Sequence, residues 1–337
     1  MKKDQLQKNK AERNKTIAIS NEEVLRLKQK ILTLNSKAQS RDILGKIINQ
    51  DIFSVLDLLP EKLVDLLFID PPYNLTKEFN SNKFKRTTAV RYEEWFDSWF
   101  SLLIKTLKPT ASVYICGDWN SSAAIFNIMS KYLKVRNRIT WEREKGRGAK
   151  SNWKNCSEDI WFGTVSKNYF FDSKAVMLKR KVVAPYRDSE GKPKDWSESE
   201  NGNYRLTHPS NLWTDITVPF WSMSENTEHP TQKPEKLLAK IILSSSRIGD
   251  VVFDPFLGSG TTSVVAKKLG RNYCGVDIDE FFCCLAEKRL EMAEYDKTIQ
   301  GYTDGVFWER NSLSEQNKND KNRMVLASGN LLEYTKI

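Results

Sequence analysis

The chain has 337 residues, enough for one large or two modest domains, and its 53 Lys and Arg against 43 Asp and Glu give a formal net charge of +10. That basic excess suits a polyanionic partner such as nucleic acid. The sequence shows no apolar signal region and no apolar run of about eighteen residues, so we expect neither secretion nor a membrane span. Five cysteines, two histidines and no C-x-x-C motif argue against a disulfide framework or a metal site, so we expect a reduced, cytoplasmic protein.

The first 44 residues are expected to form a polar arm followed by one amphipathic helix. Residues 1–20 are polar, and apolar residues then recur at three- and four-residue steps over 24–34, after Asn21 as a helix N-cap. The pattern is too short for a coiled coil. We interpret the helix as packing on the body of the protein; a role in a dimer or in DNA contact is the alternative.

Residues 45–164 alternate short apolar strands with amphipathic helices. This order predicts a doubly wound, mostly parallel α/β sheet, in which ligands bind at the carboxyl ends of the strands. Asp51 and Asp70 fall at two such ends. We expect strands at 46–50, 64–69, 112–116 and 135–141, an edge strand at 159–164, and helices at 93–107 and 120–132.

A stiff polar turn, Asp70-Pro71-Pro72-Tyr73, follows the strand at 64–69. The two prolines fix the path of the chain as it leaves the sheet. Asp70 and the carbonyl of Pro71 are acceptors beside the aromatic face of Tyr73, a combination that suits a planar amine whose two hydrogens are bonded while its ring is stacked. The alternative is a simple Pro-Pro turn with Tyr73 as packing at its rim.

Two cationic segments follow this turn in the sequence. Residues 75–92 are polar and predict a long mobile loop, and residues 142–154 predict a flexible loop that contains glycines. Both are interpreted as grips on phosphates, with solvated surface loops as the alternative. The candidate DNA contacts are Lys83, Lys85, Arg86, Arg143, Lys145, Arg147 and Lys150.

The alternating pattern is lost over residues 165–228, which are rich in aromatic and charged residues and are the best candidate for an inserted lobe that contacts a specific partner. It returns over 229–292. The last segment, 293–337, is polar and weakly patterned, and we assign it only as a C-terminal extension.

A second site is indicated by a strand at 251–253 that ends at Asp254, a Gly-x-Gly turn, a helix, and a strand at 272–276 that ends at Asp277. Gly258 and Gly260 permit close approach of a ligand to the backbone, and Asp277 can bind ribose hydroxyls. Asp254 would repel a pyrophosphate but attract a cationic amino group, which favours S-adenosylmethionine over NAD.

Three motifs, taken together, resemble one family. Asp-Pro-Pro-Tyr at 70–73, His-Pro-Thr-Gln-Lys-Pro at 229–234 and Asp-Pro-Phe-Leu-Gly-Ser-Gly-Thr-Thr at 254–262 are similar, in this order, to the β-class of DNA amino-methyltransferases, many of them from bacterial restriction–modification systems. The resemblance covers about residues 45–292. It implies a seven-stranded sheet built from 45–164 as the catalytic half and 229–292 as the cofactor half, with 165–228 as the target-recognition region.

The resemblance also implies residue roles. Asp70 and the Pro71 carbonyl would accept hydrogen bonds from an exocyclic amine, and Tyr73, which follows Pro72, would stack on a flipped base. Asp277 would bind the cofactor ribose and Asp51 its adenine. The remaining candidate cofactor residues are Asp254, Phe256, Gly258, Gly260 and Thr261 on the loop, with Thr231 and Lys233 near the cofactor carboxylate.

The reaction implied is direct, in-line methyl transfer to an exocyclic nitrogen, without a covalent enzyme intermediate. An aspartate at position 70 is usual in this family for adenine N6, and cytosine N4 is the runner-up. Carbon-5 methylation of cytosine is not expected, because no Pro-Cys pair is present. The rival functions are those of an RNA or protein-glutamine methyltransferase and of a non-catalytic DNA-binding module. Expected partners are DNA and, by the resemblance alone, a cognate restriction endonuclease and a second copy of the chain.

Overall fold

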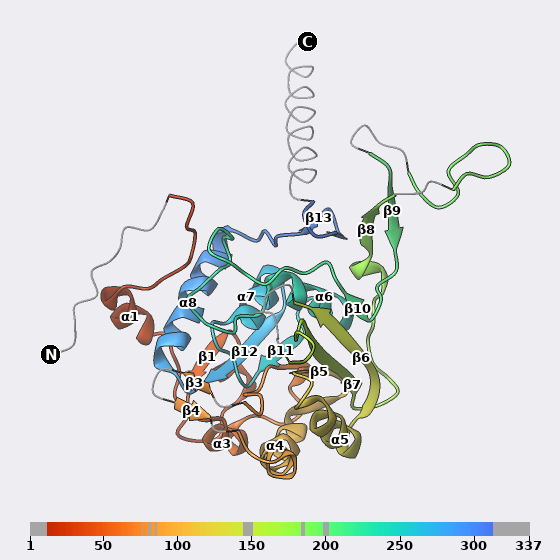
Figure 1. The fold of residues 1–337 in the computed structure, drawn as a ribbon. Helices are drawn as coiled ribbons and strands as arrows, with labels where there is room; N and C mark the ends of the chain where they lie inside the picture. The colour runs from red at the N-terminus through yellow and green to blue at the C-terminus, as the bar shows by residue number, and fades with distance from the viewer. Residues whose placement is uncertain are drawn as a thin grey trace.

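The structure is a computed structural model that describes residues 12–75, 77–79, 82–84, 86–143, 151–182, 186–197 and 202–312 (Figure 1). Its centre is an eight-stranded sheet with the order β1-β12-β11-β2-β5-β7-β6-β10. The strands of this sheet are β1 (Lys46–Asn49), β2 (Val64–Ile69), β5 (Leu107–Gly117), β6 (Lys134–Glu142), β7 (Ser157–Thr164), β10 (Leu212–Trp213), β11 (Val251–Asp254) and β12 (Asn272–Asp277).

Helices cover both faces of this sheet (Figure 1). One face packs against α3 (Ile52–Val55), α4 (Ala89–Leu103) and α5 (Ser122–Tyr132), where Phe96, Trp99 and Phe100 of α4 are fully buried. The other face packs against α6 (Glu235–Ser245) and α7 (Thr261–Lys268), and α8 (Glu280–Tyr295) packs beside α7 and β1.

The prediction of a doubly wound, mostly parallel α/β sheet is confirmed, with two differences in detail. From β1 to β5 all neighbouring strands are parallel, and β7 runs antiparallel to both β5 and β6. The expected seven strands are joined by the two-residue β10, which comes from within 165–228. The prediction of an edge strand at 159–164 is wrong, because β6 pairs along the outer side of β7 and places it inside the sheet.

The N-terminal helix is shorter than predicted. Helix α1 spans Asn21–Lys28, and Ser20, rather than Asn21, is its N-cap and forms a capping box with Glu23. The expected packing on the body is confirmed, because Arg26 and Lys30 bond Glu291 of α8. A short helix α2 (Ser40–Ile43) precedes β1.

The segment expected as a long mobile loop, 75–92, instead contains the hairpin strands β3 (Lys77–Phe79) and β4 (Asn82–Phe84) and the start of α4. Asn74 and Thr87 hold its two ends together. The Asn74 Nδ2 group donates to the Thr87 carbonyl at 3.0 Å, and the Thr87 amide donates to Asn74 Oδ1 at 2.8 Å. The hairpin therefore begins directly after the Asp70–Tyr73 turn and has a pinned base.

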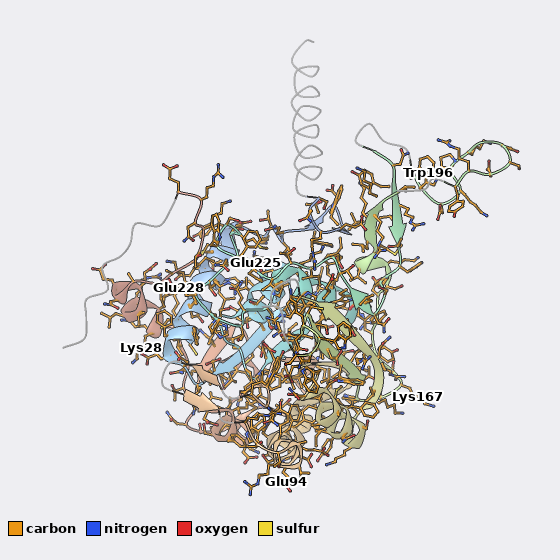
Figure 2. The ribbon with its side chains drawn as sticks, viewed as in Figure 1. Lys28, Glu94, Lys167, Trp196, Glu225 and Glu228 are labelled. Atoms are coloured by element: carbon orange, nitrogen blue, oxygen red, sulfur yellow. The ribbon has the colours of Figure 1, made fainter. Side chains whose placement is uncertain are left out.

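A second, four-stranded sheet has the order β13-β14-β8-β9. Strands β8 (Leu178–Lys181) and β9 (Tyr204–Thr207) project from the body, and Trp196 lies on the projecting part (Figures 1 and 2). Strands β13 (Tyr302–Thr303) and β14 (Val306–Trp308) come from the C-terminal extension. The region 165–228 thus shares one sheet with residues after 293 and also gives β10 to the central sheet.

Membrane association through a spanning helix finds no support in the part of the chain that the structure describes, where no helix is both long and apolar enough to cross a bilayer.

Gly260 is the position where the fold most depends on a missing side chain. It caps α7 with a φ of +82°, and an added Cβ would lie 2.5 Å from the Cβ and 3.0 Å from the Cα of Ala286 in α8. We predict that Gly260→Ala lowers the free energy of unfolding by about 1–2 kcal/mol for the left-handed backbone and by about a further 1–3 kcal/mol for overpacking. Urea denaturation measures this loss.

Gly249→Ala is the matched control. Gly249 has nearly the same φ, +85°, but no atom lies within 4 Å of an added Cβ. It should show only the backbone part of the loss. Equal losses for the two variants would contradict the packing role assigned to Gly260.

Candidate active site

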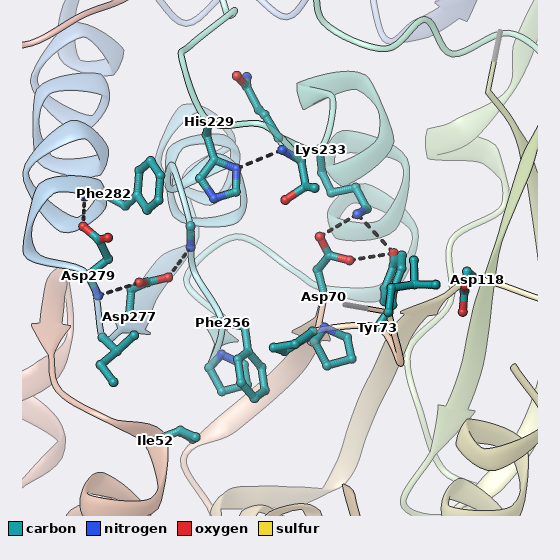
Figure 3. Close-up of a pocket in the computed structure, with 18 of the residues that line it drawn as sticks. Ile52, Asp70, Tyr73, Asp118, His229, Lys233, Phe256, Asp277, Asp279 and Phe282 are labelled. Carbon is teal, nitrogen blue, oxygen red and sulfur yellow. Dashed lines mark hydrogen bonds and ion pairs between the residues drawn. The ribbon is translucent and has the colours of Figure 1, made fainter. Parts of the chain in front are cut away.

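The carboxyl ends of the central strands open into one cavity of about 520 Å³ (Figure 3). The turn after β2 and the loop after β11 line the same cavity, although they lie far apart in the sequence. The cavity volume is in the range of small-molecule and cofactor sites. The candidate site residues that line it are Asp51, Asp70, Pro71, Pro72, Tyr73, Arg143, Thr231, Lys233, Phe256, Gly258 and Asp277.

The Asp70–Tyr73 turn is held by hydrogen bonds on both sides. The Tyr73 hydroxyl donates to Asp70 Oδ1 at 2.8 Å, and the Tyr92 hydroxyl of α4 donates to the Pro72 carbonyl at 3.0 Å. Burial, followed by the charge of Asp70, raises the pKa of Tyr73 well above its ordinary value. Tyr73 therefore stays a neutral phenol that orients Asp70 while its ring lines the cavity.

Lys233 lies against the Asp70–Tyr73 turn, whereas the sequence predicted it only near the cofactor carboxylate. Its Nζ is 2.5 Å from Asp70 Oδ2 and 3.3 Å from the Tyr73 hydroxyl (Figure 3). The same Nζ is 3.4 Å from Glu158 Oε2. Burial alone would lower the pKa of Lys233, but the charges of Asp70 and Glu158 outweigh burial and raise it. Lys233 is therefore a buried cation between two carboxylates.

Glu158 of β7 is a cavity residue that sequence reasoning missed. It is buried, its Oε1 forms an ion pair with the Arg143 guanidinium, and the same residue faces Lys233. The signal in the sequence was an acid at alternate positions with the apolar residues Ile160 and Phe162, which places it on the same buried face of the strand. Arg143, expected on a loop that grips phosphate, lines the cavity with its guanidinium paired to this carboxylate, and its contact with DNA stays a prediction.

At the other end of the cavity, Asp277 organises two backbone turns (Figure 3). Its Oδ2 accepts from the Gly258 amide at 2.7 Å, and its Oδ1 accepts from the Asp279 amide at 2.9 Å. Burial raises the pKa of Asp277 to about 6, so the group is mostly ionised at neutral pH. It remains a strong acceptor for hydroxyl donors, because each carboxylate oxygen has a further lone pair.

Gly258 and His229 meet closely beside Asp277. Gly258 has a φ of +54°, and an added Cβ would lie 3.0 Å from His229 Nε2. Burial lowers the pKa of His229 to about 4, so the imidazole is neutral. Its ring packs edge-on against Phe282, with 4.4 Å between the ring centroids. Only glycine leaves room here, as expected from the Gly-x-Gly pattern.

The other members of the predicted loop site do not line the cavity. Asp254 is buried; its Oδ2 accepts from the Thr262 hydroxyl at 2.6 Å and its Oδ1 from the Phe256 amide at 3.0 Å. It shapes the loop from within, which differs from the expected contact with a cationic amino group. Gly260 packs against α8, and Thr261 accepts a hydrogen bond from Arg289.

The features near β1 fit a nucleoside. Asp51 is the N-cap of α3, where its Oδ1 accepts from the Phe53 amide at 2.8 Å. Phe53 and Ile278 also line the cavity, and both are large apolar side chains that stay exposed. Apolar walls beside the acceptors Asp51 and Asp277 fit an adenine ring and its ribose, so the residues present fit the adenosyl part of S-adenosylmethionine.

Most of the remaining DNA contacts predicted from the sequence cannot be placed in the cavity. Lys83 lies in β4, and Arg86 is exposed between this hairpin and α4. Lys85, Lys145, Arg147 and Lys150 lie outside the described residues. Further cavity residues that the sequence did not single out are Asp118, directly after β5, Trp141 of β6, Ile278, Asp279 and Phe282.

Comparison with known proteins gives one consistent family. The model of a family described as "DNA methylase" matches residues 64–288. The DNA adenine methyltransferase YhdJ of Escherichia coli (strain K12) is 32% identical over 260 residues, which covers 74% of this chain and 83% of the relative. The type II methyltransferase M.HpaI of Haemophilus parainfluenzae is 30% identical over 249 residues, 73% of this chain and 74% of the relative.

Among solved structures, the fold is similar to that of the PvuII DNA methyltransferase (cytosine-N4-specific). The TM-score is 0.52 at 16% identity, and the match covers 74% of this chain and 91% of that one.

The burial of Asp254 has a measurable consequence. Burial raises the pKa of Asp254 to about 7, so the folded state holds this proton more tightly than the unfolded chain does, and stability present at low pH is lost as the pH rises through the folded-state pKa. Asp254→Asn cannot ionise. We predict that between pH 5 and pH 8 the unfolding free energy of the wild type falls by about 2 kcal/mol more than that of Asp254→Asn.

Urea denaturation at the two pH values measures this difference. Buried acids that do not act on Asp254 contribute to both proteins equally and cancel, whereas Asp70 and Asp277, whose charges act on Asp254, form part of the measured difference. Parallel pH dependence in the two proteins would show that Asp254 ionises as readily in the folded state as in the unfolded chain.

Proposed function

Because the chain belongs to the DNA methylase family, we propose that it transfers a methyl group from S-adenosylmethionine to the exocyclic N6 of an adenine flipped out of duplex DNA. The observation that carries this proposal is the single cavity that joins the Asp70–Tyr73 turn to the nucleoside-like end at Asp277. A base inside the duplex cannot reach side chains that line such a cavity, so the target nucleotide must leave the stack.

The proposed chemistry starts from the weak nucleophilicity of an exocyclic amine, whose lone pair is delocalised into the ring. Asp70 and the Pro71 carbonyl would each accept a hydrogen bond from one N–H of the amino group. These hydrogen bonds would favour a lone pair localised on the nitrogen. Tyr73 would hold the ring of the flipped base by stacking. Because these groups sit on a turn stiffened by two prolines and two hydrogen bonds, they are positioned before the base arrives.

Residues at the other end would hold the methyl donor. Asp277 would accept from the ribose hydroxyls, Asp51 from the adenine amino group, and Phe53 and Ile278 would flank the adenine ring. Gly258, Phe256 and Thr231 line the same cavity. When bound, S-adenosylmethionine supplies an electrophilic methyl group, and the chain supplies its orientation toward the amine.

Adenine is favoured over cytosine by two findings. The residue before Pro71 is Asp, the residue usual for adenine N6 in the class that the sequence resembles, and the relative YhdJ is named a DNA adenine methyltransferase. Cytosine N4 is the alternative. The PvuII structure, at its low identity, supports the fold and not the choice of base.

Further partners are proposals of the same kind. M.HpaI and other relatives are named type II methyltransferases, which supports a place in a restriction–modification system with a cognate endonuclease in the cytoplasm. We assign target recognition to residues 165–228, together with β13 and β14, which complete their sheet. A homodimer is the proposed assembly, and size-exclusion chromatography with light scattering tests it.

The proposed reaction is tested by its product and by one substitution. Purified protein, S-adenosylmethionine and bacterial DNA should yield N6-methyladenine when the DNA is digested and its nucleosides are separated by mass. We predict that Asp70→Asn lowers the transfer rate by about a hundredfold or more, because the carboxylate that accepts the amine hydrogens is gone, while cofactor affinity stays within about twofold, measured by isothermal titration calorimetry.

Asp65→Asn is the matched control, since Asp65 lies on the same strand β2 but at its far end, where it bonds Lys108. It should methylate at the wild-type rate. N4-methylcytosine as the product would select the alternative base, and an Asp70→Asn enzyme of wild-type activity would remove Asp70 from the mechanism.

The cationic hairpin gives a second test. We predict that reversing the charge of Lys83, Lys85 and Arg86 to Glu weakens DNA binding at every sequence and reduces the slope of log affinity against log salt by about one for each phosphate that the variant no longer binds. Lys62 and Lys105 are exposed just before β2 and β5, at the amino ends of the strands and away from the cavity. Reversing the charge of these two residues to Glu should leave the slope unchanged. An unaltered slope in the hairpin variant would show that the hairpin does not contact phosphate.

A further inference from the structure

The acceptor proposed for the amine is already occupied in this structure. Asp70 Oδ1 accepts from the Tyr73 hydroxyl at 2.8 Å, and Asp70 Oδ2 accepts from Lys233 at 2.5 Å. A carboxylate tightly paired with an ammonium is a poor acceptor for a weakly acidic N–H group, because its charge is largely neutralised. Each Asp70 oxygen keeps a further lone pair, but Asp70 becomes a strong, fully charged acceptor for an exocyclic amine only when Lys233 moves away from it.

Lys233 cannot be released into solvent. Its side chain is 7% exposed, and a buried ammonium without a counter-ion is strongly unfavourable. It therefore needs a second carboxylate within a short movement, and Glu158 provides one. Glu158 Oε2 lies 3.4 Å from Lys233 Nζ, the Glu158 side chain is 4% exposed, and this oxygen accepts no hydrogen bond from the described residues.

The other Glu158 oxygen explains why the carboxylate stays in place. Oε1 pairs with the Arg143 guanidinium, which fixes the side chain and leaves Oε2 directed at Lys233. The four groups Asp70, Glu158, Lys233 and Arg143 sum to zero charge. Movement of Lys233 from one carboxylate to the other leaves that sum unchanged, so the exchange avoids the cost of creating a net charge inside the protein.

We propose that Glu158 is a positioning residue for methyl transfer, which receives Lys233 when the amino group of the target base takes its place on Asp70. The inference rests on the proposed function. Glu158 acts through Lys233 and makes no bond to the reacting atoms. It sets how readily Asp70 exchanges an internal partner for the substrate, so it governs both the rate of transfer and the binding energy gained from the amino group.

The test compares four proteins: the wild type, Glu158→Gln, Glu158→Asp and Asp159→Asn. Gln keeps the size of the side chain and an acceptor for Arg143 but loses the charge that Lys233 needs. Asp keeps the charge, but its side chain is one methylene shorter, so the carboxylate lies farther from Lys233. Asp159 is the matched control, because it is the next residue of β7 and faces the opposite side of the sheet, where it bonds Ser122 of α5.

Two readouts are needed, and both use duplexes that carry the recognition sequence, identified by sequencing DNA methylated by the wild type. The first is the single-turnover rate of methyl transfer. The second is the affinity for a duplex with adenine at the target position relative to one with purine, which lacks the amino group. We expect Glu158→Gln to lose about tenfold or more in rate, the worth of one buried charged hydrogen bond, and to lose the preference for adenine over purine.

Glu158→Asp should fall between the wild type and Glu158→Gln in both readouts, and Asp159→Asn should match the wild type. A Glu158→Gln enzyme that keeps its rate, or one that loses rate but keeps the preference for adenine over purine, overturns the proposal. If Glu158→Gln does not fold, wild-type behaviour of Glu158→Asp overturns it. A wild type that methylates no DNA contradicts the proposed function itself, an outcome distinct from these.

Discussion

The ion pair between Lys233 and Asp70 is the contact on which the site depends, because it joins two motifs 163 residues apart in the chain. The turn after β2 carries the acid, and the segment before α6 carries the base. Burying such a pair is unfavourable unless its geometry is good and its other bonds are satisfied. Tyr73 and Glu158 meet that condition, the first by donating to Asp70 and the second by sharing Lys233. These contacts hold together the end of the cavity that the Asp70–Tyr73 turn forms.

The position of Lys233 rests in turn on an unusual helix. Helix α6 is buried on almost all sides although it carries Glu235, Lys236 and Lys240. Each of these charges has a partner on another element. Glu235 pairs with Lys268 of α7 and Arg289 of α8, and Asp215 pairs with both lysines. Lys236 also donates to the carbonyl of Trp308, so the body, the region 165–228 and the C-terminal strands are all anchored to the helix that begins two residues after Lys233.

Local patterns predicted what depends on neighbours in sequence. Apolar runs predicted the strands, and two adjacent prolines predicted the stiff turn at 70–73. The Gly-x-Gly pattern predicted that Gly258 is needed for close approach to the backbone. Long-range partners could not be read in this way. Asp254 looks like a ligand-facing acid at a strand end, but Thr262 and the Phe256 amide occupy it. Strand β7 was predicted at the edge of the sheet, because no local pattern shows that β6 pairs along its outer side. The ion pair between Arg143 and Glu158 joins residues 15 positions apart, and no local pattern predicts it.

The two ends of the cavity differ in charge, and this difference determines which chemical groups each end can accept. Its described lining contains the cations Lys233 and Arg143, and both lie at the end formed by the Asp70–Tyr73 turn, where they pair with the carboxylates of Asp70 and Glu158. The opposite end presents Asp51, Asp277 and Asp279. An acidic end repels phosphate groups but accepts hydroxyl and amino donors, which suits a nucleoside without phosphates. The end at the Asp70–Tyr73 turn likewise offers no attraction to the DNA backbone, because Asp118 adds a third carboxylate beside Tyr73 and leaves no excess of positive charge there (Figure 3). Phosphates are therefore disfavoured throughout the cavity, and a base can enter it only when its own backbone stays outside, as it does when a single nucleotide rotates out of the duplex.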